Sequence, residues 1–249
     1  MATSFGAICT DFYINTKLSL KMDLSGDRET ILHLFDRVTR SYPAMDHFHR
    51  YQQELILESS RREHEYRWCS LHRTSVRTGH VNPKSLKDAY KYHQFVLEIA
   101  PSFLSISPLD VDYLEVLFCF DLECRGNHDE VVYEALLAHS PLANLLKIPD
   151  AKMLDVQPVF GVSLSKGGDL QGFFEIKTRT RSRKGGSSRY ADEPLSVFVT
   201  VRKYGPIRQV EELVKMFDLL SSHGEKLVED YAVPNLVLPI ARQITSSNA

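Results

Sequence analysis

Long apolar runs, a disulfide framework and a strong net charge are all missing from this sequence of 249 residues. No apolar run approaches the roughly 20 residues that a membrane-spanning helix needs, so we expect no membrane association. Four cysteines are too few for the disulfide framework of a small secreted domain. The N-terminal stretch carries no basic segment ahead of an apolar one, which a signal peptide would have. We therefore expect a cytoplasmic protein.

Signatures of catalysis and of global charge attraction are missing as well. A net charge of −2 at pH 7 gives no overall field that would attract nucleic acid or a membrane surface. The sequence holds neither G-x-x-x-x-G-K-S/T nor a G-x-G-x-x-G after a strand pattern. Gly161-Val-Ser163-Leu-Ser165 lacks the closing glycine of a nucleophile elbow. These absences favour a protein without a catalytic centre and give no reason to expect a cofactor.

What the sequence does contain is a clear strand pattern over residues 112–124. Its alternate residues are apolar, namely Leu114, Val116, Phe118, Phe120, Leu122 and Cys124. The residues between them are mixed, which predicts a long strand with one face in the core. We expect Phe118 and Phe120 to be core residues of a central strand.

The same pattern stands one hundred residues earlier, in the alternating residues Leu18, Leu20, Met22 and Leu24. Each stretch is followed by a glycine, Gly26 or Gly126, and then by the signals of a helix start. The constant offset across strand, turn and helix predicts an internal duplication. We assign the repeats to residues 1–108 and 109–249; the second carries an extra strand, a long C-terminal helix and an apolar tail.

The remaining periodicities give the order β-α-β-β-α followed by β-α-β-β-β-α. This order predicts an α+β protein of two tandem ferredoxin-like repeats, with antiparallel or mixed sheets and helices packed on one face. One strand is predicted over residues 66–78, and residues 46–49 are assigned to a loop. The apolar, proline-bracketed segment 233–240 is predicted to be a short edge strand or an arm that packs on a partner.

Histidines offer one cluster that could hold a metal. It is formed by His47 and His49, with His64 and His72 not far along the chain. A His-x-His pair on a strand points both rings the same way, but no third ligand stands at a diagnostic spacing. We therefore predict no metal site, and we interpret the four cysteines as buried free thiols.

Two groups of side chains share a strand face and could carry chemistry. The carboxylates are Glu115, Asp121 and Glu123, and the aromatic group is Tyr66, Trp68 and His72. A carboxylate pair could act as acid and base if its face closed over a cavity, although a solvated strand face is the commoner structure. The aromatic group could stack on a ligand, although aromatic residues at strand period are more often core residues.

The strongest local signal is a basic segment at residues 177–189, which has no acidic residue. Its cations are Lys177, Arg179, Arg181, Arg183, Lys184 and Arg189, and the matching strand of the first repeat carries Arg67, Arg73 and Arg77. Two arginine-rich hairpins at equivalent positions would frame a surface for phosphates, RNA or an acidic protein partner. The alternative is a solvated hairpin whose charges keep an exposed edge from aggregating.

The sequence thus favours a binding or interaction protein without a catalytic centre. Two alternatives remain open: an RNA- or phosphate-binding protein that uses the basic segment, and an enzyme whose residues converge from separate strands. A net charge near zero, the apolar segment 233–240 and long strands also predict self-association, most simply as a homodimer.

Overall fold

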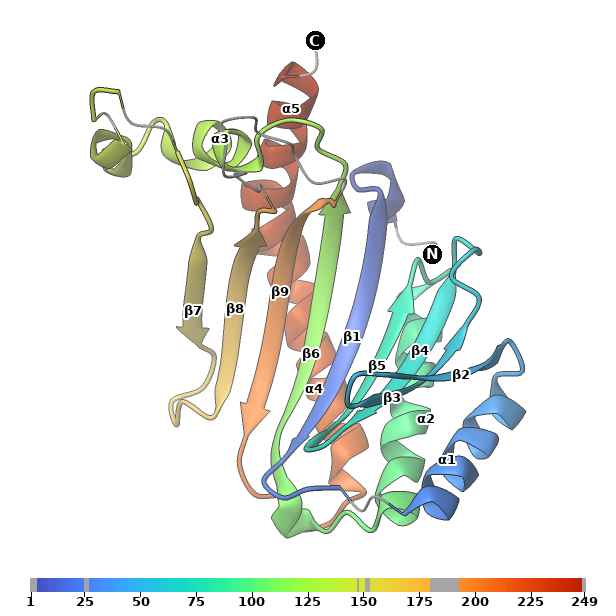
Figure 1. Cartoon of the computed structure of the whole chain (residues 1–249). Coiled ribbons are helices and arrows are strands. Elements are labelled where there is room, and N and C mark those ends of the chain that lie inside the picture. The colour runs from blue at the N-terminus through green and yellow to red at the C-terminus, as the bar shows by residue number, and fades with distance from the viewer. Residues whose placement is uncertain (1–3, 25–26, 147, 151–152, 180–192, 248–249) are drawn as a thin grey trace.

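A nine-stranded antiparallel sheet forms the centre of the structure, a computed structural model that describes residues 4–24, 27–146, 148–150, 153–179 and 193–247 (Figure 1). The strands are β1 (Asp11–Leu20), β2 (Met45–Tyr51), β3 (Glu54–Ser59), β4 (Tyr66–His72), β5 (Ser75–Val81), β6 (Val111–Leu122), β7 (Val159–Ser163), β8 (Leu170–Lys177) and β9 (Leu195–Tyr204). Their order in the sheet is β2-β3-β4-β5-β1-β6-β9-β8-β7. The predicted α+β class is confirmed.

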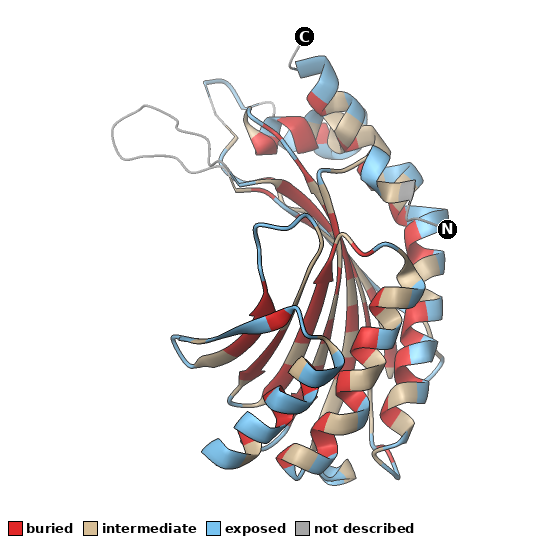
Figure 2. Cartoon of the chain, turned by 90° about the vertical axis from the view of Figure 1, so that its right-hand side faces the viewer, coloured by how far each residue is buried: buried red, intermediate tan, exposed pale blue. Residues whose placement is uncertain are grey.

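Helices cover one face of this sheet, and in the described part of the chain the other face carries no helical layer (Figures 1 and 2). The helices are α1 (Arg28–Ser41), α2 (Leu86–Leu104), α3 (His128–Val132), α4 (Glu212–Lys226) and α5 (Leu238–Ser247). Shorter or irregular helical segments are η1 (Ser4–Ala7), η2 (Pro108–Asp110), η3 (Tyr133–Leu137), η4 (Pro141–Leu146) and η5 (Leu227–Val237). α2 contacts β1 and β5, whereas α4 contacts β6 and β9. None of the described helices is both long enough and apolar enough to cross a membrane.

The hydrophobic core lies between the helices and the covered face of the sheet. Phe12 and Ile14 of β1 point into it, as do Phe118 and Phe120 of β6, because alternate strand residues share a face. Phe118 is 1% and Phe120 0% exposed, which confirms their predicted place in the core. α4 packs closely here: a Cβ atom added to Gly224 would lie 2.2 Å from the ring of Phe118.

The central strands β1 and β6 pair in a register that is symmetric about the pair of Thr16 and Val116. The pairs on either side of it include Ile14 with Phe118 and Leu18 with Leu114. The two strands also begin one hundred residues apart, at Asp11 and Val111. This register agrees with the duplication hypothesis, which stays a prediction; Gly26 lies outside the described residues.

The prediction of two ferredoxin-like repeats is not supported, because the strands of both halves join one sheet and four strands separate α1 from α2. The stretch 66–78 turns at Arg73–Thr74 into β4 and β5, and no glycine or proline marks that turn. Residues 46–49, expected to form a loop, belong to β2, whose phase toward the helices carries Arg50 next to Phe48 and so lacks the apolar alternation that would reveal a strand. The predicted repeat boundary falls within η2, just ahead of β6.

The C-terminal segment 233–240 is helical and is not an edge strand. It runs through η5 into α5, and Pro234 lies inside the irregular part. Val237 and Ile240 are both buried. The segment therefore buries apolar side chains against its own chain, while a helix supplies the backbone hydrogen bonds that a strand would have to find at the sheet edge.

Candidate functional site

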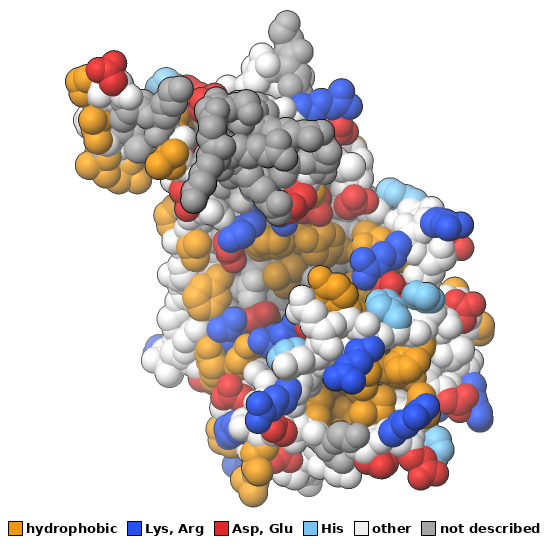
Figure 3. Space-filling view, viewed as in Figure 1, with side chains coloured by type: hydrophobic (Ala, Val, Ile, Leu, Met, Phe, Trp, Pro, Cys, Tyr) orange, Lys and Arg blue, Asp and Glu red, His pale blue; other side chains and the backbone are white. Residues whose placement is uncertain are grey.

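The sheet face without a helical layer, called the uncovered face below, is the candidate site. Directly paired residues of antiparallel strands point to the same face, so the register defines a row of side chains that crosses the sheet. From β8 to β4 this central row is Phe173, Thr200, Leu117, Asn15, Gly79 and Trp68. Figure 3 shows apolar side chains in a hollow of this face, with basic and acidic side chains around it.

Trp68 is the one tryptophan of the chain, and it lies flat on the neighbouring strand. A Cβ atom added to its register partner Gly79 would be 2.2 Å from Cε2 and Nε1 of the indole. Real Cβ atoms do not come that close, so the ring occupies the space that any other residue at position 79 would fill. Phe173 takes a similar place beside Gly161, whose added Cβ would be 3.0 Å from Cε1 of Phe173. The absence of a side chain at Gly79 and Gly161 thus lets two aromatic rings pack directly against the backbone of a neighbouring strand on this face.

Arg202 connects aromatic and charged groups next to the central row. Its guanidinium carbon lies 4.5 Å from the ring centre of Tyr113 and 5.5 Å from that of Phe173. Its Nε donates to Oε2 of Glu115 at 2.7 Å. On the far side of Tyr113, Nζ of Lys17 donates to the phenol oxygen at 2.7 Å. The result is a fixed arrangement of two cations and aromatic rings on neighbouring strands.

A half-buried carboxylate lies at the other end of the same face. Asp121 accepts hydrogen bonds from the hydroxyl of Ser196 and the thiol of Cys119. Burial raises the pKa of Asp121, although these hydrogen bonds and the charge of Arg179 lower it in part. Burial also raises the pKa of Tyr13, and the nearby thiol and carboxyl groups add to that rise. All of these groups hold one another in place.

The carboxylates that the sequence singled out do not form an acid–base pair. Glu115 and Asp121 share the uncovered face, but six residues along a strand correspond to roughly 20 Å. Glu115 is paired with Arg202, and Glu123 is paired with Arg125 at 2.9 Å. This separation excludes joint acid–base catalysis by Glu115 and Asp121 on one small substrate.

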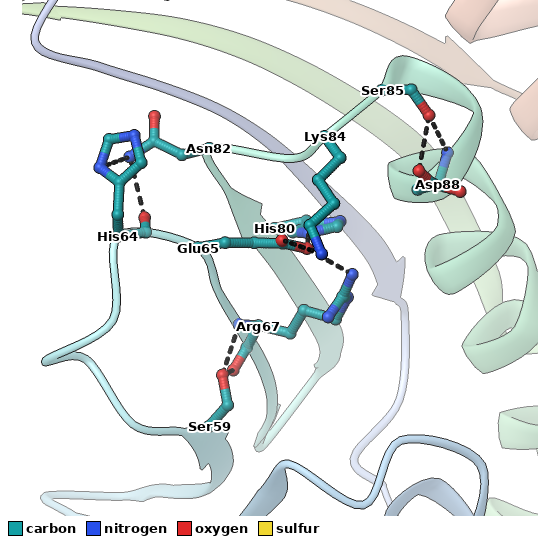
Figure 4. A network of polar contacts seen from close by, with 9 residues as sticks. All are labelled: Ser59, His64, Glu65, Arg67, His80, Asn82, Lys84, Ser85 and Asp88. Atoms are coloured by element: carbon teal, nitrogen blue, oxygen red, sulfur yellow. Dashed lines mark hydrogen bonds and ion pairs between the residues drawn. The ribbon is translucent and has the colours of Figure 1, made fainter. Parts of the chain in front are cut away.

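A pocket of about 430 Å³ lies at the ends of β3 and β4, next to the start of α2. It is lined by Tyr42, Ala44, Ser59, Glu63, Glu65, Arg67, Lys84, Asp88 and Lys91. Three of these side chains are acidic and three are basic, so the lining has no net charge. Figure 4 shows that Glu65 is the centre of the polar contacts here, between His80, Arg67 and Lys84.

The contacts of Glu65 point to a structural role. Its Oε1 lies 2.7 Å from Nη2 of Arg67 and 2.9 Å from Nε2 of His80, and its Oε2 lies 3.7 Å from Nζ of Lys84. Burial raises the pKa of Glu65, but the hydrogen bond from His80 and the two cations outweigh it and lower the pKa overall. Burial lowers the pKa of His80 from 6.5 to about 4, so the ring is neutral at pH 7. His80 does not line the pocket, and its proton serves to fix Glu65.

The predicted basic residues do not all meet on one surface. Arg181, Arg183, Lys184 and Arg189 lie outside the described residues. Lys177 ends β8 on the uncovered face, opposite Ser196. Arg179 bends back, with Nε 3.1 Å from Oε2 of Glu193 and Nη1 2.8 Å from Oγ of Ser196. The binding role of the segment stays a prediction.

The three arginines of the first half also separate. Arg67 pairs in register with His80 and faces the helices, whereas Arg77 pairs with Ser70 and lies on the uncovered face. Arg73 occupies the turn between β4 and β5, where its Nε lies 2.8 Å from Oδ2 of Asp23. The extra turn inverts the phase of the residues that follow it, which sequence alternation alone did not reveal.

The other sequence candidates have mixed outcomes. Tyr66, Trp68 and His72 do share the uncovered face, because all three belong to β4 with the same phase. The four cysteines are free thiols, of which Cys69, Cys119 and Cys124 are buried and Cys9 is half-buried. The residues that the sequence analysis missed are Lys17, Tyr113, Phe173, Phe198, Arg202 and Tyr204. They occupy the mixed phase of strands whose apolar phase had been recognised. The mixed phase of those strands could therefore have indicated which side chains share the uncovered face.

Comparison with known proteins gives no family for this chain. No protein-family model matches it, and no curated protein matches its sequence significantly.

Proposed function

We propose that this chain is a non-catalytic binding protein that receives its ligand on the uncovered face. The observation that carries the proposal is the close packing of Trp68 on Gly79, in one row with Phe173, whose ring lies next to the stacked pair of Arg202 and Tyr113. Hollow, partly apolar surfaces with a few fixed polar groups are typical of binding sites. Aromatic rings that are already held in place lose little conformational entropy when a ligand stacks on them.

The contacts of the ionisable groups support binding over catalysis. Glu115, Asp121 and Glu65 are each held by hydrogen bonds or ion pairs within the protein. A general acid or base must be able to reach a substrate proton at hydrogen-bond distance. Groups that are already committed to partners, and that lie on different parts of the sheet, suit a rigid scaffold better than a reaction centre.

Single-stranded RNA is the ligand class that this face favours. Bases stack on aromatic rings and on guanidinium planes, and phosphates bind lysine and arginine. Arg77 of β5 and Lys17 of β1 are register partners on the uncovered face, and Arg202 lies on the same face two strands further on, in β9. Together with the rings of Tyr113, Phe173 and Trp68, these cations match both parts of a nucleotide. Lys177, the first cation of the basic segment, belongs to the same face, so the basic segment and the uncovered face could contact one strand of RNA.

A binding titration tests this proposal. The anisotropy of a labelled ten-nucleotide RNA is followed in about 50 mM and about 200 mM salt, since phosphate contacts make affinity fall with salt. We expect Arg202→Gln to weaken binding and to reduce the slope of log K against log salt by about 0.7, the contribution of one phosphate contact on a single strand. Arg73→Gln is the matched control, because Arg73 lies in a turn off this face. Equal effects of the two variants, or no binding below about 10 μM RNA in low salt, would overturn the RNA proposal.

We also propose that the chain self-associates through β7, which ends the sheet. Val159, Phe160 and Val162 of this short strand are 59%, 54% and 43% exposed. Among the described residues β7 pairs only with β8, so its other edge is open to a second copy in a twofold arrangement. Light scattering should give a dimer mass that Val162→Lys converts to a monomer mass. A monomer at high micromolar concentration of the unaltered protein would contradict it.

A further inference from the structure

A second site lies at the β2 edge of the sheet, where two histidines and a carboxylate converge. His47 and His49 are two residues apart on β2 and therefore share a face. Glu58 of β3 is the register partner of His47. One potential ligand atom from each of the three side chains lies within 4.8 Å of the other two, and the two imidazole centres are 4.9 Å apart. The third ligand that the sequence spacing did not supply thus comes from the neighbouring strand.

The carboxylate of Glu58 is buried, and the contacts of Arg61 reach only one of its two oxygens. Arg61 holds Oε2 through Nε and Nη2, both at 2.7 Å. The other oxygen, Oε1, faces Nδ1 of His49 at 3.9 Å, which is too far for a hydrogen bond. Glu58 is 6% exposed, and among the described residues only its Oε2 receives a hydrogen bond. A cation between Oε1 and the imidazoles would give this largely buried carboxylate a second partner.

His49 provides a second, independent observation. Its Nδ1 atom is buried, and no hydrogen-bond partner reaches it within the part of the chain that the structure describes. A buried ring nitrogen of this kind normally has a partner. Here the nitrogen points at Oε1 of Glu58 across a gap that is the right size for an ion and not for a direct contact.

We propose that His47, His49 and Glu58 bind a divalent transition-metal ion of the zinc class. Two imidazoles and one carboxylate form a known zinc ligand set that leaves a further coordination position open to water or to a ligand. Ligand atoms at about 2.0–2.2 Å from a tetrahedral ion lie roughly 3.4 Å from one another. Closing the present separations to that value requires a small rotation of the imidazoles, and His47 is exposed and free to make it. Arg61 then orients the carboxylate through the oxygen that does not touch the metal.

The register between β3 and β4 places Trp68 close enough to the proposed ion to report its binding through fluorescence. Glu58 pairs directly with Trp68 of β4, the one tryptophan of the chain, so the indole lies one strand away from the metal. Paired side chains on one face are about 5 Å apart at Cβ. Co²⁺ quenches indole fluorescence at such short range, and Zn²⁺ added afterwards should restore it by displacing the cobalt.

The test uses the full chain without a polyhistidine tag. Co²⁺ is titrated while the Trp68 emission is recorded, and calorimetry with Zn²⁺ gives the affinity and the number of ions per chain. We expect a single ion, and we expect His47→Gln and His49→Gln each to weaken binding more than tenfold, since even outer-sphere changes cost 10–100-fold. Because His47 is exposed, its variant should fold normally. His64→Gln is the control, as an exposed histidine outside the cluster.

Glu58→Gln distinguishes a metal centre with three protein ligands from metal binding by two surface histidines alone. A pair of surface histidines would bind the ion equally well without the carboxylate, whereas the proposed site should lose at least tenfold in affinity. Unchanged affinity in Glu58→Gln or in His47→Gln would overturn the proposal. So would the absence of quenching and of binding heat at about 1 mM metal, the weakest range in which a site is meaningful.

Discussion

Replacing Gly79 with alanine tests the packing at the centre of the uncovered face. The added Cβ would lie 2.2 Å from Cε2 and Nε1 of Trp68, whereas carbon atoms in contact prefer about 3.5–4.0 Å. The indole must therefore tilt or leave β5, and overpacking of this kind costs about 1–3 kcal/mol. Without the indole, alanine in a strand would be more stable than glycine by about 0.5–1 kcal/mol. The sign of the change in unfolding free energy thus reports where the ring of Trp68 lies.

Urea unfolding followed by circular dichroism measures this effect in Gly79→Ala, in Trp68→Ala and in the double variant. We expect Gly79→Ala to lower the free energy of unfolding by about 1–3 kcal/mol in the native background. In the Trp68→Ala background the same change should be neutral or stabilising, because the clash is gone. The resulting coupling energy should fall in the range of about 0.5–3 kcal/mol that residues in contact show. A stabilising effect in the native background would refute the packing that places Trp68 in the candidate site.

Three further outcomes test the covered side of the sheet. Phe120→Ala should lower the free energy of unfolding by about 3–5 kcal/mol, because Phe120 is 0% exposed and packs with Phe5 and Phe12; a loss below about 1 kcal/mol in urea melts would contradict its core position. Gly224→Ala should lower the free energy of unfolding by about 1–3 kcal/mol through the clash with Phe118. Alanine in a helix is otherwise more favourable than glycine by about 1 kcal/mol, so a stabilised variant would exclude the close approach of α4. Burial lowers the pKa of His80 to about 4 and that of His93 to about 3 in the folded protein, so their stabilising effect is complete above pH 6.5 and is lost as the pH falls below it. Denaturant melts should show a slope of about 1.4 kcal/mol per pH unit for each histidine, and His93→Gln should reduce the slope; a flat profile from pH 6.5 to 4.5 would contradict the burial of both rings.

The sequence predicted those elements whose apolar residues alternate without interruption. β1 and β6 were recognised because one phase is apolar from Leu114 to Leu122 in β6 and, apart from Thr16, throughout β1. Their central pairing is consistent with the offset of one hundred residues. β2 was missed because its phase toward the helices holds Arg50 next to Phe48, so it does not alternate between apolar and polar residues. The turn at Arg73 was missed because neither glycine nor proline marks it, and missing it joined two strands into one.

The candidate sites could be predicted only in part, because both depend on which strands become neighbours. Tyr66 and Trp68 share a face on a single strand, which alternation alone predicts. The pairing of Trp68 with Gly79 and of His47 with Glu58 requires the register between strands, and the sequence does not contain it in readable form. Arg67 and Arg77 were placed together because the extra turn between them was not recognised.

Shielding of Trp68 by RNA is the most direct test of the proposal that ligands bind to the uncovered face. Acrylamide quenching of the single tryptophan is measured with and without a saturating ten-nucleotide RNA, in protein whose RNA binding is followed in parallel by anisotropy. An RNA strand that lies along the central row would cover the indole, so we expect a clear fall in the quenching constant on RNA binding. Saturated RNA binding with an unchanged quenching constant would place the ligand elsewhere on the molecule and overturn the proposal.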